Sequence, residues 1–254
     1  MTRPDCMARG SGGRWGAAAL VAGLLAGLAA CAGAPPPPDW QMAALGASER
    51  AVAAYLAGNT RVEALEFERL RRETARTGDA TQVARAALLR CATRVASLVL
   101  EDCAAFEALR QDAAAPERAY ADYLAGRPQA QDLALLPPQH QVAAARLLQG
   151  TAVTAADAAT LASISDPLAR LVAAGVWLRA GQGHPAVMAL AVDTASARGW
   201  SRPLLAWLQV QARHAELGGD VAGAQRLRRR MALVLSAGKL APQDSVELGT
   251  HQNK

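Results

Sequence analysis

Cys91 and Cys103 are the residues whose type and spacing most directly suggest chemistry in this sequence. In an exported protein, an even pair of cysteines is a disulfide candidate, and closing this short loop would stabilise the fold by about 3 kcal/mol. One straight helix would hold the two Cα atoms about 18 Å apart, whereas a disulfide needs about 5.5 Å. We therefore predict a disulfide, on condition that the helix breaks soon after Ser97. The alternative is two reduced cysteines that fill a core.

A run of arginines near the carboxyl end is the second candidate site: Arg226, Arg228, Arg229 and Arg230. It is the most one-signed cluster in the chain, and guanidinium groups bind carboxylates and phosphates through paired N–H donors. We predict that these side chains contact an anionic partner, either lipopolysaccharide phosphates or an acidic protein. The alternative is that their long aliphatic stems cover apolar surface.

The histidines and acidic residues form no pattern that predicts catalysis or metal binding. None of the four histidines has a second His, Cys or acidic residue at metal-ligand spacing. The sequence has no nucleophile elbow and no phosphate-binding loop. Glu63, Glu66 and Glu68 are interpreted as one solvated helix face. We therefore expect no enzyme activity, no cofactor and no metal.

The amino-terminal segment has the layout of an export signal. Three arginines within the first 16 residues precede an uninterrupted apolar run from Ala17 to Ala30. A helix of that length would span about 21 Å, which is shorter than the roughly 30 Å hydrocarbon core of a bilayer. We therefore predict that residues 1–30 are a signal peptide rather than a membrane-spanning helix.

The apolar run ends in Leu28-Ala29-Ala30-Cys31, which resembles the lipobox of bacterial lipoproteins. The resemblance implies that Cys31 is acylated and becomes the first residue of the mature protein. Two or more acyl chains hold a protein on a membrane almost permanently. Ala32 rather than Asp follows the cysteine, which by analogy with lipoprotein sorting favours the outer over the inner membrane. The alternative is a buried cysteine in an uncleaved anchor helix.

A proline-rich spacer, Pro35–Pro38, follows the predicted lipid anchor. Consecutive prolines adopt the extended polyproline II conformation, so residues 31–38 would lift the rest of the protein off the bilayer. After removal of the signal, 24 basic and 21 acidic residues remain, so the mature chain is only mildly basic. Because the protein would be exported and lacks nucleic-acid-binding motifs, we expect no nucleic-acid partner.

Composition and periodicity predict an all-α domain over residues 39–236. Alanine supplies 62 of the 254 residues, and Ala, Leu and Arg favour helices, whereas strands are rich in β-branched and aromatic residues. Helix-start signals recur along the chain. They are a capping box at residues 60–63, a cap at Asp79 and the pair Asp166-Pro167.

Glycine turns in this domain resemble those of tetratricopeptide-type repeats. Gly181 and Gly219 each precede an alanine, Ala186 and Ala224, by five residues. In such repeats a glycine ends one helix, and the small residue lets the next helix approach closely. The segment Tyr-Leu-Ala-Gly also occurs twice, at 55–58 and 123–126. The resemblance implies a helical hairpin array, a degenerate α-solenoid; the alternative is an irregular helical bundle.

These features together predict a lipid-anchored bacterial envelope protein that faces the periplasm. Its all-helical domain would be followed by a flexible tail over residues 237–254. Helical arrays present long concave surfaces to other proteins, so we expect a scaffold that binds a protein or peptide partner. The alternatives are a cell-wall enzyme or enzyme accessory with an unfamiliar site, and a structural spacer in an envelope assembly.

Overall fold

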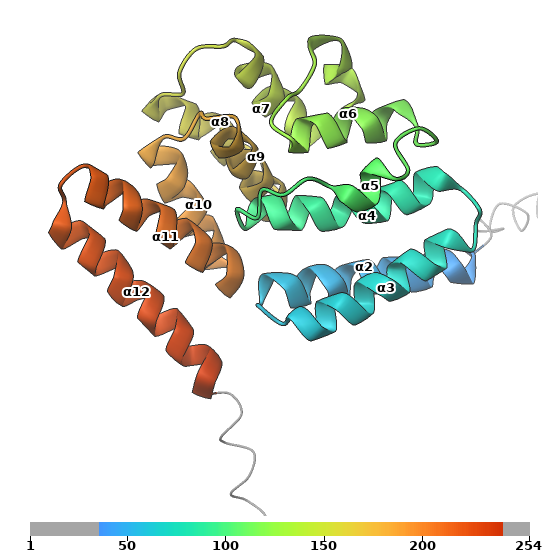
Figure 1. The fold of residues 1–254 in the computed structure, drawn as a ribbon, viewed down its shortest axis with the longest axis horizontal. Helices are drawn as coiled ribbons and strands as arrows, with labels where there is room; N and C mark the ends of the chain where they lie inside the picture. Colours follow the sequence, from blue (N-terminus) through green and yellow to red (C-terminus); the bar gives the residue numbers. More distant parts are fainter. Residues whose placement is uncertain (1–35, 241–254) are drawn as a thin grey trace, which may run out of the picture. The chain divides into compact units, whose positions relative to one another are not determined.

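The computed structural model describes residues 36–240, and every regular element within them is a helix. No β-strand occurs in this range, so the predicted all-α fold class is confirmed. The helices, labelled in Figure 1, are α2 (Asp39–Leu56), α3 (Thr60–Ala75), α4 (Ala80–Ala96), α5 (Ala104–Glu107), α6 (Ala115–Leu124), η2 (Ala130–Leu135), α7 (Pro138–Leu148), η3 (Ala155–Asp157), α8 (Ala158–Ala162), α9 (Pro167–Arg179), α10 (Pro185–Ala197), α11 (Ser201–Leu217) and α12 (Val221–Leu240).

Helices that are neighbours in the sequence pack against each other as hairpins. Figure 1 shows α2 beside α3 and α11 beside α12, and α9 packs against α10 in the same way. α4 connects these pairs, because it contacts α2 and α3 on one side and α6 and α9 on another. The predicted helical hairpin array is therefore confirmed.

Most of the glycine turns share one type of helix ending. At the end of α6, the N–H of Gly126 donates to Tyr123 O (2.8 Å) and the N–H of Arg127 donates to Asp122 O (2.9 Å). The same pair of hydrogen bonds ends α2 at Gly58. This Schellman ending needs a positive φ at the glycine, and φ is 76° and 91° at the two positions. The repeated Tyr-Leu-Ala-Gly segments are thus two equivalent helix ends.

α9 lies at the centre of the core and is buried on nearly all sides. Where it crosses α4, Gly175 comes so close that a Cβ atom would lie 2.3 Å from the carbonyl oxygen of Val95. The indole N–H of Trp177 donates to Ala143 O in α7 at 3.0 Å. Trp207 in α11 donates in the same way to Ala96 O at the end of α4. These contacts connect helices that are far apart in the sequence.

The start of α3 differs from the prediction. The predicted capping box at residues 60–63 does not form, and Asn59 caps the helix instead by accepting the Val62 N–H at 3.1 Å. Glu63, which would have completed the box, is instead bonded to Arg90 of α4. The two predicted caps at Asp79 and Asp166 do accept the backbone N–H groups of their helices.

The end of α12 also differs from the prediction. The helix continues to Leu240, four residues into the predicted tail of 237–254. The sequence contains no strong helix breaker before Pro242, so the helix can extend to this point. The rest of the predicted tail, the predicted signal peptide and Cys31 lie outside the described residues.

Candidate functional site

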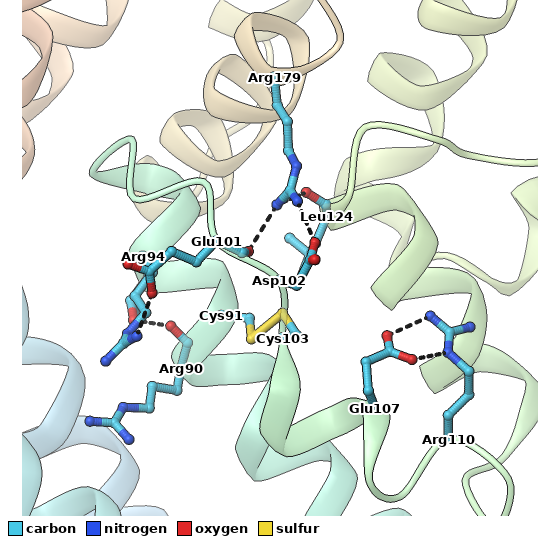
Figure 2. The surroundings of a disulfide bond; sticks show 11 residues. Arg90, Cys91, Arg94, Glu101, Asp102, Cys103, Glu107, Arg110, Leu124 and Arg179 are labelled. Carbon is cyan, nitrogen blue, oxygen red and sulfur yellow. Dashed lines mark hydrogen bonds and ion pairs between the residues drawn. A yellow bond between two sulfur atoms is a disulfide. The ribbon is translucent and has the colours of Figure 1, made fainter.

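Cys91 and Cys103 are joined by a disulfide in the structure, with their Cα atoms 5.9 Å apart (Figure 2). α4 ends at Ala96, and Leu98 then takes a left-handed conformation with φ of 60°. It is the one non-glycine residue with positive φ among the described residues. The chain reverses there through the same backbone hydrogen bonds that end α2 and α6. The helix therefore breaks directly after Ser97, which is the condition for this pairing.

The loop that carries Cys103 is held in place by Arg179 at the end of α9 (Figure 2). The Arg179 guanidinium donates to the backbone oxygen of Glu101 at 3.1 Å and to the carboxylate of Asp102 at 3.1 Å. It also reaches the carbonyl oxygen of Leu124 at the end of α6, at 3.5 Å. The disulfide and this arginine together fasten the loop to α4, α6 and α9, which is a structural role.

The predicted arginine cluster lies on α12, beside a groove that this helix forms with α11 and the start of α10. The volume of the groove is about 610 Å³. Arg226 and Arg230 line it together with His214, while Met188 and Leu227 contribute apolar surface. Two of the four predicted arginines thus share one site.

The other two arginines of the cluster do not line this groove. The Arg228 guanidinium is in contact with the carboxylate of Glu216 on α11. Arg229 is exposed on another part of the helix surface. The helical period explains the division, because residues 223, 226, 227 and 230 of α12 centre on one side that faces the groove, whereas residues 228 and 229 each lie more than about 100° from that centre.

Positive charge predominates in the groove. Its acidic residue, Asp220, caps α12 by accepting the Gly223 N–H at 2.8 Å and lies 4.0 Å from the Arg226 guanidinium. Arg226 and Arg230 are exposed, so their charges act through water and are screened by salt. Two guanidinium groups beside apolar surface can bind carboxylates that are carried on a partly apolar ligand.

The sequence did not predict that two glutamates are buried and that each is bonded to an arginine of another helix. Glu63, which the sequence places on a solvated face, is only 4% exposed and is bonded to Arg90. Glu117 of α6 is 6% exposed and is bonded to Arg85 at 2.6 Å. Both arginines belong to α4, and they lie 27 residues from Glu63 and 32 residues from Glu117 in the sequence. No local sequence pattern therefore predicts these ion pairs.

Comparison with known proteins assigns no family. No family model, no curated protein and no solved structure matches this chain. Within residues 36–240, no helix is long and apolar enough to cross a membrane. The same part of the chain contains no cluster of three or more His, Cys, Asp or Glu side chains that could hold a metal ion. The candidate site therefore rests on its geometry alone.

Proposed function

We propose that this chain is a lipid-anchored protein of a bacterial envelope, and that its periplasm-facing helical domain binds an acidic protein or peptide. The anchor rests on Leu28-Ala29-Ala30-Cys31 and on the proline spacer that follows it. The binding role rests on one observation: Arg226 and Arg230, one helical turn apart, line the same partly apolar groove.

The chemistry of this groove favours a carboxylate-bearing partner. A guanidinium group can donate two parallel N–H bonds to a carboxylate, which gives geometric specificity as well as affinity. The apolar surface of Met188 and Leu227 would contact the aliphatic or aromatic side chains of the same partner. The resemblance to tetratricopeptide repeats remains a prediction, and it supports the proposal because such arrays bind peptides and proteins on their surfaces.

The proposal can be tested with a photoreactive amino acid at Gln211, which lines the groove. Irradiation of intact cells should link the protein to a partner whose crosslinked segment is rich in Asp and Glu. Replacing Arg226 and Arg230 by Gln should lower the crosslinking yield at least about tenfold, because hydrogen bonds between charged groups are lost.

A control variant replaces Arg213 and Arg229 by Gln, which removes the same charge from the same hairpin but outside the lining of the groove. Its crosslinking yield should stay close to that of the unmodified protein. If the two double variants lose the same fraction of the yield, net charge rather than the groove attracts the partner, and the proposed binding site is wrong.

A further inference from the structure

A second pocket, which shares no lining residue with the α11–α12 groove, lies between α4, α6 and the segment from η2 to the start of α7. Its volume of about 460 Å³ is within the range of sites that hold small ligands. Its lining includes leucines of α4 and of the segment from η2 to α7, Tyr120 and three prolines. Arg85 and Glu117 are the charged residues of its wall.

The carboxylate of Glu117 has an unused hydrogen-bond acceptor. Its Oε1 accepts the Nε–H of Arg85 at 2.6 Å, and its side chain is only 7% exposed. Its Oε2 is buried and receives no hydrogen bond from any described residue. A buried acceptor without a donor is costly. The terminal torsion of a glutamate is broad, so the carboxylate can turn to serve Arg85 and a second donor together.

Glu63 serves as a comparison for Glu117, because it is also buried but only joins two helices. Its Oε1 accepts from the Nε of Arg90 at 2.8 Å and its Oε2 from an Nη of the same side chain at 3.3 Å. Its side chain is 5% exposed, which is nearly the same burial as that of Glu117. Both oxygens of Glu63 are therefore satisfied within the protein, whereas Glu117, a residue of the pocket wall, keeps one buried oxygen without a donor.

We propose that this pocket binds a peptide segment through one large apolar side chain, with a backbone N–H of the peptide donating to Glu117. Arg85 donates only its Nε–H to Glu117, and its side chain is 57% exposed. Its other N–H groups can therefore donate to a backbone carbonyl of the same peptide. A peptide bond offers both groups together. Because Arg85 already balances the charge of the carboxylate, a neutral N–H is a better donor here than a cation.

This inference deepens the proposed function and rests on it, since it names the class of ligand and a second contact surface. The probe is N-acetyl-photoleucine N-methylamide, a blocked amino acid that carries a diazirine in an apolar side chain. It is irradiated with the full chain in membrane vesicles, and the labelled segments are identified by mass spectrometry. We expect labels in residues 85–92 and 135–138, and we expect N-acetyl-leucine N-methylamide to compete with them.

Glu117→Gln tests the acceptor directly. In this variant the one remaining side-chain oxygen would accept the Nε–H of Arg85. The side-chain NH₂ group, which is a donor, would then face the backbone N–H donor of the peptide. Labelling of the pocket should fall at least about tenfold, as expected for the loss of a charge-assisted hydrogen bond. Glu63→Gln makes the same change in the other buried glutamate and should leave the labelling unchanged in the folded protein.

A second pair of variants does not alter a buried charge. Leu135 lines the pocket and is 37% exposed, while Leu148, which does not line it, is 39% exposed. Leu135→Asp should abolish the competed labelling, and Leu148→Asp should preserve it. Because both positions are partly exposed, neither variant is expected to unfold the protein.

The inference would be overturned if no label in the pocket were competed by the blocked leucine. It would also be overturned if either Glu117→Gln or Leu135→Asp were labelled as strongly as the unmodified protein. A fourth contrary outcome is competition by decanoate as strong as that by the blocked leucine. The last would show that the pocket takes an acyl chain. If labelling succeeds while Cys31 is not acylated, the proposed anchoring fails and the peptide site stands. If groove crosslinks form without pocket labelling, only the peptide site fails.

Discussion

His140 of α7 and Tyr123 of α6 form a polar pair inside the core. The hydroxyl oxygen of Tyr123 lies 3.3 Å from Nδ1 of His140, and both side chains are almost fully buried. Burial lowers the pKa of His140 to about 4 and raises the pKa of Tyr123 well above its ordinary value. At neutral pH both groups are therefore uncharged, and one neutral hydrogen bond between them is compatible with a dry interior.

The shifted pKa of His140 makes a prediction about acid stability. Its folded-state pKa of about 4 lies below the ordinary 6.5, so the unfolded chain binds the proton first as the pH falls. The stabilising contribution is complete above pH 6.5 and is lost progressively as the pH falls from 6.5 to 4, by roughly 3 kcal/mol in all. Urea unfolding measured at a series of pH values should show this loss.

His140→Gln should abolish this part of the pH dependence. Tyr123→Phe is the control, because it removes the hydroxyl group but leaves the imidazole buried, so the pH dependence should persist. Equal slopes of the free energy of unfolding against pH in the unmodified protein and in His140→Gln would contradict the assignment.

At the scale of elements, the crossing of α4 and α9 depends on the absence of one side chain. A Cβ at Gly175 would lie 2.3 Å from the backbone oxygen of Val95 and 3.0 Å from its side chain. Backbone cannot move aside as a flexible side chain can, so the two helices would have to separate. Alanines of both helices are buried in the same core as this crossing, and small side chains allow closely spaced helices to pack without voids.

Gly175→Ala should therefore destabilise the protein, by about 3 kcal/mol, even though alanine is the better helix former. Gly46→Ala is the matched control within α2, because the added methyl group would meet only the flexible end of Arg50. That exchange should be neutral or stabilising by about 0.5 kcal/mol. Denaturant titrations of the two variants measure these changes in the free energy of unfolding. A Gly175→Ala protein as stable as the unmodified one would show that the helices can separate at little cost.

At the scale of the whole molecule, side chains from the second half of the sequence hold helices of the first half. Arg202 at the start of α11 donates to the backbone oxygen of Tyr55 at 2.7 Å and to the hydroxyl of Thr60 at 2.8 Å. Trp207 binds the end of α4, and Arg179 binds the loop after it. Helices that are connected in this way keep the α11–α12 groove and the α4–α6 pocket on one compact unit.

The proposed lipid anchor predicts how the whole molecule partitions between membrane and water. Cys31→Ser should abolish the incorporation of radiolabelled palmitate and release the protein from the membrane fraction, because the acylated thiol is lost. Cys6→Ser makes the same exchange at the other amino-terminal cysteine and should leave both measurements unchanged. Continued labelling of Cys31→Ser would rule out the proposed anchor.

Much of the helical framework could be predicted from local sequence. The caps at Asp79 and Asp166 and the glycine helix ends all depend on residues a few positions apart. The left-handed conformation of Leu98 could not be predicted in this way, because a leucine rarely adopts a positive φ. The groove itself was not predicted: the cluster of four arginines predicted an anionic contact, but only the packing of α12 against α10 and α11 shows that Arg226 and Arg230 share the lining of one groove.

The order of the amino acids alone determined the all-α class and the positions of most helix ends, because these follow from short-range backbone preferences. The packing of the helices decided between a hairpin array and an irregular bundle. Only the tertiary structure decided that Glu63 and Glu117 are buried and that one oxygen of Glu117 is left without a donor. The physical reason is that the burial and the partners of a charged group depend on side chains that packing brings from distant parts of the chain.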